Sequence, residues 1–199
     1  GIIIASSNAS HYRYLNLAIS KGIPILCEKP LIWKNRITAN YLKASIDALE
    51  KKKESLLFFN TSNRFLVRRA MRMFKRNMQQ IYQFSFFFNT HGRKRYNNIA
   101  IDLLPHALSA LHEVFGFKRI TNVKKEISLN TCIFFFKYDF CQIKFELKQD
   151  EKFEKTLWLK LNEKKFYRKQ TGKNETYRVF IEDEEKKSLS EVEDPFITN

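Results

Sequence analysis

Residues 1–30 read GIIIASSNASHYRYLNLAISKGIPILCEKP, the order of a β-strand, a polar turn, an amphipathic helix and a second strand. Ile2–Ala5 is a continuous apolar run, which is typical of a strand covered on both sheet faces. Gly22 stands where a left-handed residue ends a helix, and Ile23–Cys27 is the next apolar strand. This order predicts a parallel βαβ unit.

Polar residues follow each of these two strands. Ser6-Ser7-Asn8 supplies a turn and a helix N-cap, which we assign to Asn8. Glu28-Lys29-Pro30 closes the second strand at its carboxyl end, the edge at which open parallel sheets bind ligands. Lys29 is therefore either a ligand-contacting residue or an ordinary surface lysine after a strand.

The next segment continues the same alternation. Asn35–Lys53 is predicted to be a long helix that buries Ala39, Leu42, Ile46 and Leu49, and Ser55–Asn60 is a further apolar strand. Alternating strands and helices indicate a Rossmann-type doubly wound parallel sheet, of which residues 1–62 form the C-terminal part. Residues 1–62 are therefore expected to have an α/β fold.

The pattern changes after residue 62. A basic helix at 66–76, a strand at 81–88 and a helix at 101–115 come first. Period-two alternation then follows, with Ile143, Phe145 and Leu147, and later Leu157, Leu159 and Leu161, at every second position. Such alternation predicts strands with one buried face. Residues 63–199 are thus expected to be an α+β domain, a mainly antiparallel sheet with helices on one face.

Asp102 and His106 stand four residues apart in the second predicted helix. That spacing puts both side chains on one helix face, and a carboxylate beside an imidazole is the arrangement a general base needs. Pro105 is tolerated near a helix start, which places Asp102 close to the N-terminus. The alternative is that Asp102 caps the helix and His106 packs in the core.

Composition narrows the function classes. No apolar run is long enough to span a membrane, and no signal peptide is visible. Three cysteines without metal-ligand spacing favour a reducing compartment and no metal site, so we expect a cytoplasmic protein. The net charge of +15 is spread through every segment, which does not favour nucleic-acid binding.

Several of these features occur in one order along residues 1–120. They are the strand Ile2–Ala5, the turn Ser6-Ser7-Asn8 with His11, then Glu28-Lys29-Pro30, Asn63-Arg64-Phe65, the pair Asp102 and His106, and a helix ending at Phe115-Gly116. Together they resemble the glucose–fructose oxidoreductase/inositol dehydrogenase/MocA family of NAD(P)-dependent oxidoreductases. Glu-Lys-Pro alone is a weak motif, but the set in this order is specific.

The resemblance implies hydride transfer between NAD or NADP and a hydroxyl carbon of a sugar, sugar derivative or polyol. His106 would accept the hydroxyl proton, Lys29 would hydrogen-bond that hydroxyl and the nicotinamide ribose, and Asp102 would hold the substrate or the histidine. The implied cofactor-binding residues are Ser6, Asn8, His11, Glu28, Lys29 and Pro30. The implied substrate-binding residues are Lys29, Arg64, Asp102 and His106.

The resemblance also bears on the extent of the protein. The family's glycine-rich phosphate loop is absent from the sequence, so we expect an internal part of a longer enzyme that is inactive alone. A homo-oligomer formed through the sheet of the second domain is also implied. Two other classes stay open: a non-catalytic family member that acts as a binding or regulatory subunit, and a basic nucleic-acid-binding α+β domain.

Overall fold

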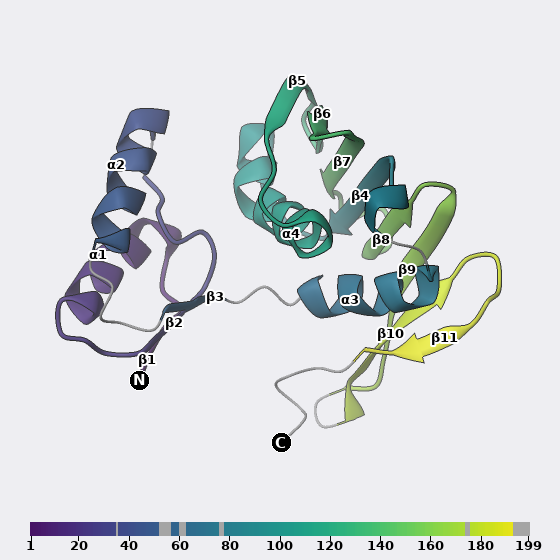
Figure 1. The fold of residues 1–199 in the computed structure, drawn as a ribbon. Coiled ribbons are helices and arrows are strands. Elements are labelled where there is room, and N and C mark those ends of the chain that lie inside the picture. The colour runs from purple at the N-terminus through teal and green to yellow at the C-terminus, as the bar shows by residue number, and fades with distance from the viewer. Residues whose placement is uncertain (35, 52–56, 60–62, 76–77, 174–175, 193–199) are drawn as a thin grey trace. The chain divides into compact units, whose positions relative to one another are not determined.

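The computed structural model describes residues 1–34, 36–51, 57–59, 63–75, 78–173 and 176–192 (Figure 1). The chain divides into two compact units, Gly1–Thr61 and Ser62–Asn199. The elements of the first unit are β1 (Ile2–Ile4), α1 (Asn8–Ile19), β2 (Ile25–Cys27), α2 (Ala39–Glu50) and β3 (Leu57–Phe59).

The first unit is the parallel sheet that the sequence predicts. Its strands pair in the order β1-β2-β3, and both pairs are parallel. Gly22 has φ +65 after α1, in the left-handed region predicted for it. Its apolar core consists of Ile4, Leu15, Ala18, Ile19, Ile25 and Cys27.

Two local predictions in this unit are wrong. The N-cap of α1 is Ser7, whose backbone is extended, so Asn8 is the first helical residue. The expectation that Ile2–Ala5 is covered on both faces also fails, because Ile3 is 74% exposed. The reason is that Ile4 points to the sheet face on which Leu15 and Ala18 of α1 pack, whereas Ile3 points to the opposite face.

The buried face of α2 also differs from the prediction. Ala39, Leu42 and Ile46 are exposed, whereas Ser45 is buried and Leu49 packs against the core. Ser45 and Leu49 are four residues apart, so the contact stripe is rotated from the most apolar stripe of the helix. Thr38 caps the helix by accepting a hydrogen bond from the backbone of Tyr41, and part of the predicted span lies outside the described residues.

The second unit opens with α3 and a short 3₁₀ turn and continues as a sheet with one long helix. Its elements are α3 (Asn63–Phe74), η1 (Met78–Gln80), β4 (Gln83–Thr90), α4 (Asn97–Phe115), β5 (Ile120–Ile127), β6 (Thr131–Tyr138), β7 (Cys141–Gln149), β8 (Thr156–Leu161), β9 (Lys164–Thr171), β10 (Arg178–Asp183) and β11 (Leu189–Glu191). Among the helices of the described residues, none is both long and apolar enough to cross a membrane.

The eight-stranded sheet has the order β11-β10-β9-β8-β4-β7-β6-β5. Its pairs are antiparallel except for β4 with β7, which run parallel. Ile143, Phe145 and Leu147 are buried as the alternation predicts, in the core that β7 shares with α3 and α4. This mainly antiparallel sheet with helices on one face confirms the predicted fold class.

α4 begins earlier than predicted. It runs from Asn97, after Tyr96 at φ +53, and the backbone of Tyr96 donates a hydrogen bond to the carbonyl of Leu129. Pro105 therefore lies inside the helix, and the expectation that it marks the helix start is wrong. Pro105 has no N–H to donate, but the packing of α4 on the sheet compensates for the missing bond.

A matched pair of substitutions in β1 tests which face of this strand is covered. Ile4 is 4% exposed and Ile3 is 74% exposed, so Ile4→Ala should lower the free energy of unfolding by about 2–5 kcal/mol. Ile3→Ala should cost about 1 kcal/mol or less, since it removes little buried surface. Chemical denaturation, monitored by hydrogen exchange in residues 1–34, would measure the loss of unfolding free energy in each variant. Equal losses would show that Ile3 is covered in solution.

Candidate functional site

α4 brings Asp102 and His106 to one of its faces, as their spacing predicts. Both side chains are half-buried. The neighbouring positions Leu103 and Ala107 point into the core and hold this face in register with the sheet. The helix therefore sets the two polar groups side by side at the margin of the core.

The imidazole of His106 packs against an aromatic ring. The ring of Phe88 in β4 meets the His106 ring edge-on, with 5.5 Å between centroids and 90° between planes. The His106 carbonyl accepts a hydrogen bond from the Ser109 hydroxyl at 3.0 Å. The ring packing restricts the orientation of the imidazole.

Asp102 is hydrogen-bonded to Gln149, a residue that sequence reasoning missed. The Gln149 Nε2 donates to Asp102 Oδ2 at 2.7 Å, and its Oε1 accepts from the backbone N–H of Lys94 at 2.6 Å. Gln149 is fully buried. Its position was the available signal: it continues the buried positions of β7 as an amide, and a buried amide needs partners.

Arg64, a predicted substrate-binding residue, lies at the start of α3 and forms an ion pair with Glu113 of α4. Its Nε lies 3.4 Å from Glu113 Oε2, and Arg68 pairs with the same carboxylate. Arg69 donates to the hydroxyl of Ser190. α3 thus engages the guanidinium groups of Arg64, Arg68 and Arg69 within the unit.

In the first unit, His11 joins the two loops that follow β1 and β2. Its Nδ1 lies 2.8 Å from the carbonyl of Pro30, and its Nε2 lies 2.9 Å from the carbonyl of Ser6. The ring is 1% exposed. The structure thus shows His11 as a link that ties together the carboxyl ends of two parallel strands.

The remaining predicted cofactor-binding residues surround this link. Ser6 is exposed, and its hydroxyl lies 2.8 Å from that of Ser10. Glu28 and Lys29 are half-buried, and the Glu28 backbone donates to the Ile4 carbonyl at 2.9 Å. Asn8 is half-buried at the first position of α1, and the Lys29–Pro30 peptide is cis.

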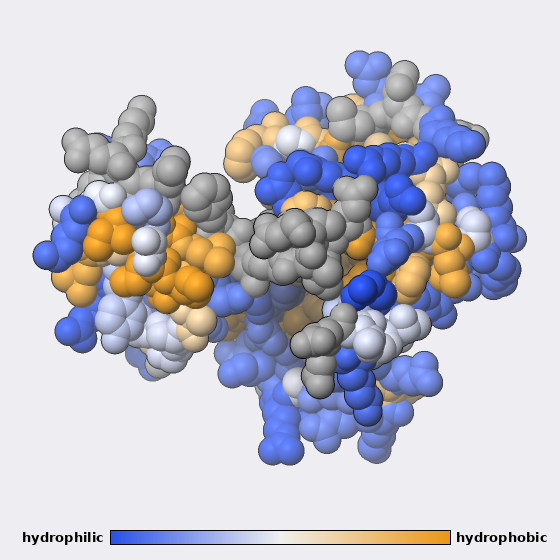
Figure 2. All heavy atoms as spheres, turned by 90° about the horizontal axis from the view of Figure 1, so that it is seen from below, coloured by the Kyte–Doolittle hydropathy of each residue, from blue (hydrophilic) through white to orange (hydrophobic). Residues whose placement is uncertain are grey.

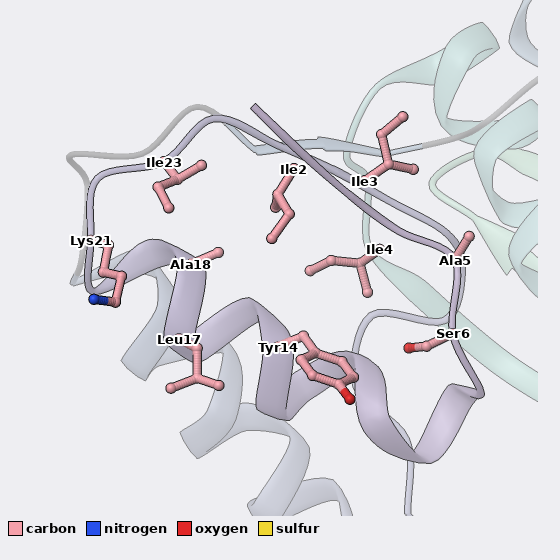
Figure 3. A pocket seen from close by; sticks show the side chains of 10 residues that line it. All are labelled: Ile2, Ile3, Ile4, Ala5, Ser6, Tyr14, Leu17, Ala18, Lys21 and Ile23. Carbon is pink, nitrogen blue, oxygen red and sulfur yellow. The ribbon is translucent and has the colours of Figure 1, made fainter.

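A separate pocket lies beside the open edge of β1, with a cavity volume of about 440 Å³ (Figure 3). Ile2 and Ile4 point from β1 toward Leu17 and Ala18 of α1, and the surface around β1 is largely apolar (Figure 2). Ser6 is the one predicted site residue in its lining. The apolar lining does not suit proton or hydride transfer.

The described residues contain no group of three or more His, Cys, Asp or Glu side chains arranged to hold a metal ion. The thiols of Cys27, Cys132 and Cys141 are buried. Burial raises the pKa of Cys27 to about 11 and that of Cys141 to about 12, with Glu28 adding to the shift at Cys27. Burial also raises the pKa of Cys132.

Comparisons by sequence and by structure give different results. No protein-family model matches this chain, and no curated protein sequence matches it. Solved structures do match, and those compared are oxidoreductases or dehydrogenases. Their identities of 12–17% mean that the likeness shows the fold alone.

Three of these structures illustrate the match. The WlbA (WbpB) dehydrogenase from Thermus thermophilus, in complex with NAD and alpha-ketoglutarate, has TM-score 0.62 and 16% identity over 83% of this chain and 59% of that chain. Dehydrogenase MviM from Clostridium difficile has TM-score 0.63 and 17% identity over 96% and 62%. An oxidoreductase from Agrobacterium radiobacter, in complex with NAD+, L-tartaric acid and magnesium, has TM-score 0.58 and 15% identity over 94% and 59%.

The chain therefore spans 59–66% of the length of the structures it matches.

Thiol labelling tests the buried cysteines. Because a thiol with a pKa of about 11 or 12 is protonated at pH 8, Cys27 and Cys141 should react with iodoacetamide at least roughly a hundredfold more slowly than in urea. Their rates should rise as the pH increases toward those values, while the fold persists. Mass spectrometry of labelled peptides gives the rates. Fast labelling of native Cys27 would mean that the β1–β2 core opens.

Proposed function

We propose that this chain belongs to an oxidoreductase that transfers a hydride between NAD or NADP and a hydroxyl-bearing carbon of a sugar, sugar derivative or polyol. The observation that carries the proposal is the pair of Asp102 and His106 on one face of α4, with Gln149 bonded to Asp102 at 2.7 Å. A carboxylate fixed beside an imidazole is the machinery of a general base.

The residues have separate tasks in this reaction. The nicotinamide, when bound, supplies the acceptor for the hydride. His106 accepts the hydroxyl proton while the C–H electron pair departs as hydride, so that the alcohol carbon is oxidised to a carbonyl. Asp102 orients the imidazole or the substrate, and Phe88 fixes the plane of the ring. In the reverse direction His106 returns the proton.

The first unit would hold the cofactor. Its polar groups, including Asn8, Glu28 and Lys29, follow the carboxyl ends of parallel strands, where α/β sheets bind dinucleotides. A lysine and a carboxylate suit the hydroxyls of a ribose, and Lys29 also bonds the reacting hydroxyl in this proposal. His11 acts beneath them by holding the Ser6 and Pro30 loops together.

The substrate class rests on the resemblance and on the neighbours. One structure of the WlbA (WbpB) dehydrogenase is in complex with NAD and UDP-GlcNAcA, a sugar derivative. The resemblance assigns Arg64, which lies at the start of α3 and pairs with Glu113, to an anionic substituent of such a substrate. Because the chain spans 59–66% of the matched structures, the activity is proposed for the full-length protein, with a cytoplasmic location.

A homo-oligomer is proposed through the sheet face that lies opposite α3 and α4. Phe87 and Trp158 project to this face and stack with 5.3 Å between centroids and 7° between planes. The ammonium group of Lys165 lies 4.8 Å from the Trp158 ring and 4.6 Å from the Tyr167 ring. Partly exposed aromatic side chains on a broad sheet are typical of protein interfaces.

His106→Ala in the full-length protein tests the catalytic assignment. Turnover should fall by roughly two to four orders of magnitude, the usual contribution of positioned acid–base catalysis, while cofactor affinity stays within about twofold. Steady-state oxidation of sugars and polyols, followed by nicotinamide absorbance, is the measurement. Higher pH should restore part of the lost rate, because the alkoxide then forms without a base.

His112→Ala is the matched control, since His112 lies on the same helix, is exposed and packs against Phe117. Its turnover should remain near that of the unmodified protein. Equal turnover of His106→Ala and His112→Ala would show that Asp102 is a structural residue of α4 and His106 a packed histidine, without a role in catalysis. Absence of nicotinamide binding by the full-length protein would overturn the proposed function as a whole.

A charge on the open sheet face tests the oligomer. Trp158→Glu should convert the full-length protein to monomers in analytical ultracentrifugation, because it removes the ring that stacks on Phe87 and puts a carboxylate, costly to desolvate even beside Lys165, into the interface. Phe117→Glu is the control, since Phe117 is 91% exposed at the end of α4 and does not lie on this face. An unchanged mass for Trp158→Glu would exclude this face as the interface.

A further inference from the structure

Gln149 occupies an unusual position for an amide side chain. It ends β7 with 0% of its surface exposed, on the same strand face as Ile143, Phe145 and Leu147. Across the parallel pair it lies opposite Thr90, the last residue of β4. The chain that leaves β4 toward α4 therefore passes directly over this side chain.

The hydrogen bonds of Gln149 define which way its amide faces. The Lys94 backbone N–H can only donate and bonds to Oε1 at 2.6 Å, whereas the Asp102 carboxylate can only accept and bonds to Nε2 at 2.7 Å. Exchanging oxygen and nitrogen would break both bonds. A directed chain thus runs from the Lys94 backbone through the amide to Asp102, and each bond polarises the next.

The loop over the amide leaves it little room to move. A Cβ added to Gly92 would lie 2.4 Å from Gln149 Oε1, so the glycine backbone packs directly on the amide. His91 Nε2 lies 2.8 Å from the carbonyl of Phe153, which holds the loop at its start. The backbone of Tyr96 donates to Leu129 at 3.1 Å and holds the end of the loop.

We propose that Gln149 is a positioning residue that fixes the Asp102 carboxylate for proton transfer at His106. The inference rests on the proposed function, because it assigns Gln149 a task in that reaction. One Asp102 oxygen is bonded to a buried and immobile donor, so the carboxylate cannot rotate without breaking that bond. Displacement of such a group by about 1 Å costs on the order of a hundredfold in rate.

Gln149→Glu gives the test a signature that simple damage to the fold would not give. A protonated glutamic acid can reproduce both bonds, because its carbonyl accepts from Lys94 and its hydroxyl donates to Asp102. An ionised glutamate instead faces the Asp102 carboxylate. The nearby ionisable groups are Asp102 and His106 on α4, His91 on the loop, and Lys148 and Asp150, which form an ion pair at 3.5 Å.

The experiment compares Gln149→Met and Gln149→Glu with Gln79→Met and Gln79→Glu in the full-length protein. Gln79 lies in the short turn η1, is exposed and belongs to no strand, so it controls for the substitution of a glutamine as such. The measurements are kcat and KM from pH 5 to 9, and hydrogen exchange of the Lys94 amide, which requires no substrate.

Gln149→Met should lower kcat by roughly ten- to a hundredfold with KM changed less than about threefold, and should speed exchange at Lys94 by about tenfold or more. The deficit of Gln149→Glu relative to the unmodified protein should shrink as the pH is lowered. The Gln79 variants should match the unmodified protein in all three measurements.

Different failures have different meanings. If the unmodified protein is active and Gln149→Met keeps its kcat, the positioning role is overturned and the proposed function stands. If Gln149→Glu shows the same deficit at every pH, Gln149 is a packing residue only, and the positioning role is again overturned. If the unmodified protein oxidises no sugar or polyol with either nicotinamide cofactor, the proposed function fails and this inference fails with it.

Discussion

The parallel pairing of β4 with β7 is the constraint on which the second unit depends. Parallel neighbours place their carboxyl ends at one sheet edge and require a crossover between them, which here runs through α4, β5 and β6. Thr90 and Gln149 therefore end opposite each other. Three features meet at this one edge: the exit of the chain toward α4, the buried amide of Gln149 and the polar face of α4. An antiparallel β7 would have put Gln149 at the other end of the sheet.

Much of the fold follows from hydrophobic periodicity. The apolar strands β1, β2 and β3 form the parallel sheet, and the alternation around Phe145 forms a sheet with one buried face, as expected. The failures lie where neighbours decide burial. Ile3 is apolar but points to the sheet face opposite α1, and Leu42 lies on the most apolar stripe of α2 but not on the stripe that meets the core. Pro105 misplaced the start of α4, because tertiary packing overrides its low helix propensity.

The candidate site could be found in part. Asp102 and His106 are visible from a spacing that any helix would bring onto one face. Phe88 and Gln149 are not visible in that way, because each reaches α4 only through the pairing and register of β4 and β7. His11 was expected beside a ligand, and the structure gives its ring two backbone partners that no local pattern encodes. Residues that act through neighbours distant in sequence require the three-dimensional arrangement.

The contacts of Gln149 also determine which substitutions positions 92 and 94 can accept. Lys94 takes part through its backbone, so nearly any side chain at that position keeps the bond, and proline alone among the common residues would remove the donor. Position 92 is restricted instead, because a Cβ on any residue other than glycine would overlap the Gln149 amide. Within residues 92–94, position 94 therefore tolerates substitution and position 92 does not. The lysine, although charged and conspicuous in the sequence, is the replaceable one, and the plain glycine is the residue that the architecture retains.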